Sequence, residues 1–188
     1  AAETEYAVKV AAVCGESLSE ALTGTFSTPK AGPANCGVLV DIDGNKYATV
    51  QIGEQCWMAQ NLRTKIGVTG DYGYPLDIVS DSLLYGRMYS WTVATNNTAA
   101  EAYDSKVQGI CPTGWHIPTA TDISNVQGGV AALNLPKAGY YNTAGLVSFG
   151  NNGFIWTSTT FDGDSDAYNS NLGHSSKLYG YSVRCLKD

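Results

Sequence analysis

The sequence predicts a mixed α+β domain with a mostly antiparallel sheet, and three observations lead to this fold class. The chain has 21 glycines in 188 residues, which indicates many turns and irregular loops rather than a bundle of long helices. Asp43-Gly44-Asn45 is a strong hairpin turn between two β-rich runs. Thr119 is the clearest helix start, and short strand-like runs separated by Gly and Asn turns follow it.

We predict two parts, an N-terminal extension over residues 1–37 and a main domain over residues 38–188. The extension is rich in Ala, Thr and Ser. Its run from Tyr6 to Val13 is too short for periodicity to distinguish a strand from a helix. We expect the extension to pack on the main domain, with a disulfide between Cys14 and Cys36 as one candidate tie.

The main domain begins with a predicted hairpin. Val38 to Ile42 and Tyr47 to Ile52 are rich in β-branched residues and flank the Asp43-Gly44-Asn45 turn. After Trp57-Met58-Ala59, a loop-like stretch extends to Leu84. A loop of this length needs its own side chains to pack against one another.

Two helices are expected. Tyr89 to Ala94 is a candidate short helix, and Thr119 with Asp122 three residues later forms a capping pattern after Pro118. Because Gly128 and Gly129 each weaken a helix by about 1 kcal/mol relative to alanine, the second helix is short or ends near Leu133. Short strands are predicted at residues 138–141, 146–149, 154–158, 168–172 and 181–186.

Strand alternation makes a specific prediction for the last of these strands. It places Tyr181, Val183 and Cys185 on one face, and Ser182 and Arg184 on the other. We expect the first face to be the buried one.

Composition limits the function. The formal net charge of -6 and a pI near 4.8, with no basic stripe, argue against a nucleic-acid partner, since phosphate binding requires clustered Lys and Arg. No run approaches the roughly 18 apolar residues that a membrane-spanning helix needs, so we expect a soluble molecule. The five cysteines are too scattered for zinc and predict disulfides, hence an extracellular or surface-displayed protein, with one thiol left free or paired between chains.

Six blocks of the sequence stand out together: Asp43–Tyr47, Ile52–Leu62, Tyr85–Trp91, Cys111–Pro118, Trp156–Thr159 and Ser182–Cys185. In order and spacing they resemble the Fibrobacter succinogenes major paralogous domain over about residues 38 to 188. This family is similar to the C-type lectin fold, in the branch that contains formylglycine-generating enzymes. The resemblance implies a small twisted antiparallel sheet, one or two helices and long irregular loops, but no shared activity.

These blocks suggest structural roles for their cysteines. Cys111 and Cys185 each lie in a block, and we favour a disulfide between them over the alternative of two buried thiols. Cys56 lies beside Trp57 and is expected to pack as a small hydrophobic residue.

Other residues of the blocks are also expected to be structural. We predict that His116 makes a turn or core hydrogen bond, and that Arg87 and Arg184 hold loop carbonyls or carboxylates. The tryptophans of the blocks are predicted to lie in the core: Trp57, Trp91, Trp115 and Trp156.

The run from Phe161 to Gly180 differs from the blocks on either side of it. It reads FDGDSDAYNSNLGHSSKLYG, a mixture of Ser, Gly, Asn, Asp and aromatic residues that is typical of adaptable contact surfaces. We predict that it binds a ligand, a protein first and a glycan second. The expected contact residues are Phe161, Asp162, Gly163, Asp164, Ser165, Asp166, Ser170, Leu172, His174, Ser175, Leu178 and Tyr179.

The same run resembles the variable region of proteins diversified by retroelements, which share this fold. In those proteins, mutagenesis of template adenines yields only residues that pyrimidine-ending codons encode, which excludes Trp, Met, Gln, Glu and Lys. Between Phe161 and Tyr181 the sole excluded residue is Lys177. Loops rich in Gly, Ser and Asn lack the excluded residues anyway, so the alternative is an ordinary loop.

We expect no enzyme and no cofactor. The formylglycine-generating relatives have a copper-binding cysteine pair that finds no counterpart here, and the sugar-binding motifs of calcium-dependent lectins are missing. Asp162, Asp164 and Asp166 alternate as in a calcium loop, but Ala167 and Gly173 break the rest of that pattern, which leaves a weak calcium site as the alternative to a solvated acidic loop.

The sequence thus favours a non-enzymatic ligand-recognition domain. One alternative is a structural subunit of a surface or fibre assembly, in which the N-terminal residues make subunit contacts. Another is an enzyme of the formylglycine-generating type.

Overall fold

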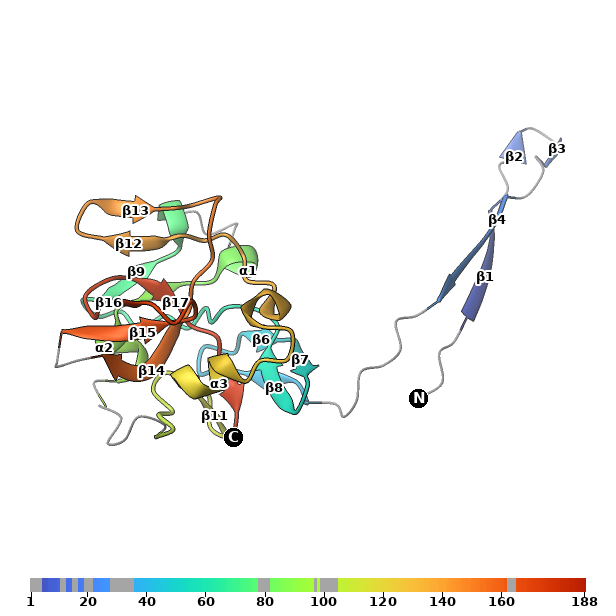
Figure 1. The fold of residues 1–188 in the computed structure, drawn as a ribbon. Coiled ribbons are helices and arrows are strands. Elements are labelled where there is room, and N and C mark those ends of the chain that lie inside the picture. The colour runs from blue at the N-terminus through green and yellow to red at the C-terminus, as the bar shows by residue number, and fades with distance from the viewer. Residues whose placement is uncertain are drawn as a thin grey trace. The chain divides into compact units, whose positions relative to one another are not determined.

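The computed structural model divides the chain into two units, residues 1–35 and residues 36–188. In the first unit it describes the backbone of four strands. In the second it describes residues 36–77, 82–96, 98, 105–161 and 165–188. Figure 1 shows the two units.

The first unit contains a β-hairpin. Strand β1 (Glu5–Val10) pairs antiparallel with β4 (Leu22–Ser27), and β2 (Val13–Cys14) pairs with β3 (Ser17–Leu18). The apolar run that begins at Tyr6 is therefore a strand. The prediction that this segment packs on the main domain stays a prediction.

The second unit is mostly antiparallel β structure arranged in small sheets. One sheet has the order β11-β18-β8-β7 and another has the order β17-β10-β9. Their strands are β7 (Thr49–Ile52), β8 (Gln55–Met58), β9 (Asp71–Gly73), β10 (Met88–Tyr89), β11 (Trp115–His116), β17 (Tyr181–Ser182) and β18 (Leu186–Lys187).

A third sheet and two hairpins complete the described strands of this unit. The sheet has the order β14-β15-β16, with strands β14 (Trp156–Phe161), β15 (Asp166–Asn169) and β16 (His174–Ser176), which run side by side in Figure 1. The hairpins are β12 (Tyr140–Asn142) with β13 (Gly145–Val147), and β5 (Leu39–Val40) with β6 (Lys46–Tyr47).

The predicted hairpin turn is confirmed, although the strand after it is divided. The Asp41 carboxylate accepts hydrogen bonds from the Asp43 and Asn45 amides at 3.0 and 2.8 Å and so closes the turn between β5 and β6. The chain expected as one strand from Tyr47 to Ile52 separates at Ala48. Its second half, β7, pairs with β8 instead, a strand that was not among those predicted from the sequence.

Three short α-helices occur in the described residues, where one or two were expected. They are α1 (Ser82–Tyr85), α2 (Trp91–Ala94) and α3 (Ala120–Ser124). The capping pattern at Thr119 is confirmed, because Thr119 and Asp122 exchange side-chain to backbone hydrogen bonds at the start of α3. The described residues also contain 3-10 turns at Pro75–Asp77 and Val130–Leu133. Because α3 ends at Ser124, the predicted helix is short and does not reach Leu133.

The four tryptophans are buried as predicted, in two hydrophobic clusters. Trp91, Trp115 and Trp156 lie in the larger cluster, and Trp57 lies in the smaller one. Trp156 also donates from its indole nitrogen to the Tyr89 carbonyl at 2.8 Å, which joins β14 to β10.

Two disulfides are present. Cys111 bonds to Cys185, as predicted, and Cys36 bonds to Cys56. The candidate bridge between Cys14 and Cys36 is therefore wrong, and Cys56 is not a packed thiol. Cys56 lies in β8, and the sequence did not reveal the pairing of β8 with β7.

The expected burial of Tyr181, Val183 and Cys185 is confirmed, but Ser182 and Arg184, expected on the other face, are buried as well. Every residue from Tyr181 to Leu186 is buried, on both faces. Regular pairing stops after Ser182, and the segment that follows passes through the core, where the carbonyls of Val183 and Cys185 accept hydrogen bonds from the amides of Leu62 and Met58 at 2.8 and 3.0 Å. Arg184 is a structural donor, as expected: it donates to the Asn61 side chain and the Leu133 carbonyl.

Candidate functional site

The run predicted to bind a ligand forms β15, β16 and the end of β14. In this sheet Phe161 pairs with Asp166, and Tyr168 pairs with His174. Directly opposed residues share a face, and neighbours along a strand alternate between faces. One face therefore carries Ala167, which is fully buried, and the other carries residues that reach the surface.

The surface side of this sheet has a compact group of side chains, which we call the aromatic face: Phe161, Asp166, Tyr168 and His174. The Phe161 and His174 rings are stacked, with centroids 3.9 Å apart and an interplanar angle of 6°. Tyr168 meets Phe161 edge-on at 5.3 Å. Asp166 Oδ2 lies 2.9 Å from His174 Nδ1, and the His174 side chain is 50% exposed.

Two leucines extend the surface from the loops beside this sheet. Leu172 is 44% exposed and adopts a φ of 55° in the turn between β15 and β16. That turn is held by Asn169, whose side-chain oxygen accepts a hydrogen bond from the Asn171 amide at 2.9 Å. Leu178, after β16, is 70% exposed, and its carbonyl accepts a hydrogen bond from the Tyr72 hydroxyl.

Three of the predicted contact residues make contacts inside the domain, and their part in ligand binding stays a prediction. Ser170 is fully buried, and its hydroxyl accepts a hydrogen bond from the Ile155 amide at 3.2 Å. Ser175 opposes Ala167 on the inner face and bonds the Tyr181 hydroxyl at 2.8 Å. Tyr179 packs against the large cluster and stacks on Tyr140 at 6.0 Å.

The remaining predicted contact residues lie between β14 and β15. Asp162, Gly163 and Asp164 lie outside the described residues, so their roles and the calcium alternative stay predictions. Ser165 is exposed, and its carbonyl accepts a hydrogen bond from the Lys177 amide at 2.8 Å. Lys177 itself is buried, with its ammonium group 4.4 Å from the centre of the Trp91 ring.

Tyr168 is the residue of the aromatic face that sequence reasoning left out. Its signal was available, because Tyr168 lies two residues after Asp166 and a strand places such residues on one face. The composition of the run, on which the predicted contact residues rest, gives no such pairing.

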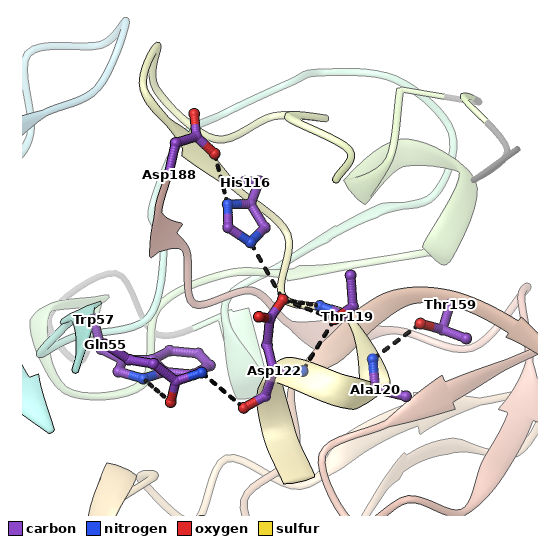
Figure 2. Close-up of polar contacts among 8 residues, drawn as sticks. All are labelled: Gln55, Trp57, His116, Thr119, Ala120, Asp122, Thr159 and Asp188. Atoms are coloured by element: carbon purple, nitrogen blue, oxygen red, sulfur yellow. Dashed lines mark hydrogen bonds and ion pairs between the residues drawn. The ribbon is translucent and has the colours of Figure 1, made fainter. Parts of the chain in front are cut away.

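A separate cluster of polar side chains surrounds His116. Figure 2 shows the imidazole between two carboxylates, with Nδ1 at 2.7 Å from Asp188 Oδ1 and Nε2 at 3.3 Å from Asp122 Oδ2. The ring is buried, and both of its nitrogens face a partner. The expectation that His116 makes core hydrogen bonds is confirmed.

The Asp122 carboxylate is the centre of this cluster. Burial acts to raise its pKa, but hydrogen bonds from His116 and from the Thr119 amide and hydroxyl outweigh burial, so the pKa is lowered. Figure 2 also shows Gln55 donating to the Asp122 carbonyl and the Ala120 amide donating to Thr159. The cluster therefore joins β8, β11, β14 and the residue after β18 to α3, beside a pocket of about 260 Å³.

Two further properties bear on function. Among the residues that the structure describes, no three His, Cys, Asp or Glu side chains gather as a metal site requires. None of the described helices is long and apolar enough to cross a membrane.

The family model of the Fibrobacter succinogenes major domain matches residues 50–132. The match begins within β7 and ends within the 3-10 turn at Val130–Leu133, so it includes α2, α3 and His116 but not the aromatic face. Comparison with curated proteins and with solved structures gives no match.

Proposed function

We propose that residues 36–188 form a non-enzymatic ligand-recognition domain with a C-type lectin-like fold, and that the aromatic face with Leu172 and Leu178 is its contact surface. The single observation that supports this proposal best is the stack of Phe161 on His174, edged by Tyr168, in which the His174 side chain is 50% exposed. Aromatic side chains offer large contact area with little conformational entropy to lose, which is why they dominate binding surfaces.

The framework beneath this surface supports the same function. Ala167, Asn169 and Ser170 are buried directly below it, and Lys177 is fixed against Trp91. A surface whose supporting residues are buried and hydrogen-bonded presents its side chains in one arrangement, which lowers the entropy lost on binding. Only the outer residues of this surface therefore need to complement the surface of a partner.

The proposed ligand is a protein, with a glycan as the alternative. Leucines that are 44% and 70% exposed beside stacked rings resemble the apolar anchors of protein interfaces, while Asp166 and Ser165 supply polar contacts at the edge. The two disulfides favour an oxidising compartment, so the proposed location is a cell or virion surface.

The test is a matched pair of triple variants screened on arrays of surface proteins and of glycans. Leu172→Asn, His174→Ala and Leu178→Ser together should abolish any binding that the unchanged chain shows, with little change in melting temperature. Asparagine suits position 172 because it tolerates a positive φ.

The control variant combines Val38→Ser, Val40→Ser and Ile42→Ser, three exposed aliphatic residues away from this sheet. It should bind as the unchanged chain does. Equal binding by both variants would contradict the proposal, and binding confined to glycans would replace a protein ligand with a sugar.

We also propose that a retroelement diversifies this surface. Lys177, the residue that pyrimidine-ending codons exclude, is a buried framework residue, whereas Ser165, Leu172, His174 and Leu178 are exposed and belong to the allowed set. The neighbouring DNA should then contain a near-copy of the stretch that encodes residues 161–180, beside a reverse transcriptase gene. A neighbourhood without that copy would remove the proposal.

A further inference from the structure

The N-terminal hairpin has a strongly sided residue pattern. Its register places Tyr6 opposite Phe26, Val8 opposite Gly24 and Val10 opposite Leu22. The alternate positions pair Glu5 with Ser27, Ala7 with Thr25 and Lys9 with Thr23. One face therefore holds apolar residues and glycine, and the other face holds polar residues and alanine.

A hairpin of this kind is incomplete by itself. Two strands alone are at best marginally stable in water, whereas three or more strands with an apolar face can be stable. Within the described strands of this unit, β1 pairs with β4 and with no other strand, so among these strands its second edge is available to pair with another. An open edge of this kind is a template for another strand.

The residues along that edge would form favourable pairs with a second copy of β1. If two copies of β1 lie antiparallel with Ala7 opposite Ala7, Glu5 of each copy falls opposite Lys9 of the other. The same register places Tyr6 opposite Val8. Opposite charges and aromatic with β-branched residues are both favourable pairs when directly opposed in a sheet.

We propose that β1 is the pairing edge for a second copy of this chain, with a two-fold axis at Ala7. The product is a four-stranded antiparallel sheet in the order β4-β1-β1-β4, with its apolar residues on one face. The charges select β1 over the other edge, since β4 has no charged residue to specify a register. This dimer does not depend on the proposed ligand surface.

The first experiment measures the mass of the full chain by sedimentation over a range of concentrations. The unchanged chain should form a dimer. Either Lys9→Glu or Glu5→Lys should weaken the dimer about tenfold or more, because two attractive cross-strand pairs become repulsive. The double variant with both changes should restore it, since the pairs are then reversed but still opposite in charge.

Lys46→Glu is the matched control, because Lys46 is an exposed lysine of the second unit and should leave the dimer unchanged. A monomer at every concentration would overturn the proposal. So would a double variant that stays as weak as the single ones, because a general charge effect would explain that result.

The second experiment tests the register by cross-linking in a Cys14→Ser background. Ala7→Cys should give a covalent dimer on oxidation, since directly opposed Cα atoms lie about 4.5 to 5.5 Å apart, within the range of a disulfide. Lys9→Cys should not, because the two copies of position 9 would lie four residues out of register, about 13 Å apart. Equal cross-linking at both positions would overturn the proposed register.

Discussion

At the scale of single residues, buried carboxylates organise this protein's irregular loops. Asp71 accepts hydrogen bonds from the amides of Ile66, Gly67 and Gly73 and from the Arg87 guanidinium, and Asp41 accepts from the Asp43 and Asn45 amides and from three side chains. Long loops without regular pairing would leave many polar groups unsatisfied. A carboxylate with four lone-pair sites provides the missing acceptors.

Because of these carboxylates, we expect the stability of the domain to fall in acid. Burial acts to raise the pKa values of Asp41, Asp71 and Asp122, but their hydrogen bonds, with the Arg87 charge at Asp71, outweigh burial and lower all three below 3.8. A lowered folded pKa adds stability that is present above the unfolded pKa and is lost as the pH falls through the folded value. Urea unfolding between about pH 6 and about pH 2 should show this loss.

Asp71→Asn is the control for that prediction. It should lower the free energy of unfolding near neutral pH, because the Arg87 charge loses its partner, and it should make the acid loss less steep. An unchanged acid slope would show that Asp71 does not contribute to it.

A second prediction at this scale concerns Arg184. Burial lowers its pKa to about 10, so it stays charged at neutral pH, and it satisfies the Asn61 side chain and the Leu133 carbonyl together. Arg184→Met should cost about 2 to 4 kcal/mol of unfolding free energy, because two buried acceptors lose their donor. Arg184→Lys should recover part of that cost, and a variant as stable as the unchanged chain would contradict the role.

At the scale of elements, short strands are specified by their partners more than by their own residues. The hairpin at Asp43-Gly44-Asn45 and the start of α3 were predictable, because turn and cap residues act locally. Strand β8 and the bonding of Cys56 were not, because Gln55–Met58 becomes a strand only by pairing with β7 on one side and β18 on the other. The aromatic face was predictable as a region, but its division into outer and buried residues needed the register of β15.

This register predicts contrasting tolerance at neighbouring positions. Ala167→Leu should destabilise the domain by about 1 to 3 kcal/mol, because Ala167 is fully buried and the added atoms overpack the core. Leu178→Ser should change stability by less than about 0.5 kcal/mol, because its side chain is largely exposed. Thermal unfolding of the two single variants measures both, and similar losses would mean that the sheet faces are assigned wrongly.

At the scale of the whole molecule, the C-terminal segment connects parts of the domain that are distant in the sequence. Residues Tyr181 to Leu186 touch β8, β10 and the Cys111 loop, and Arg184 reaches the 3-10 turn at Val130–Leu133. Their complete burial could not be predicted from strand alternation, because it results from contacts on all sides. The family match, at residues 50–132, ends before this segment.

Removing each disulfide in turn tests how much the attachment of the C-terminal segment contributes to stability. Cys111 and Cys185 are 74 residues apart and Cys36 and Cys56 are 20 apart, so the longer closed loop removes more entropy from the unfolded chain. Loop-closure entropy predicts a cost of about 4 kcal/mol for Cys111→Ala with Cys185→Ala, and about 3 kcal/mol for Cys36→Ala with Cys56→Ala. Urea unfolding of the two double variants should rank them in this order. Because both cysteines of the longer bridge are also buried, repacking losses add to its cost. If loss of the shorter bridge cost more, the stability of the domain would depend more on fixing Cys36, the first residue of this unit, than on holding the C-terminal segment in the core.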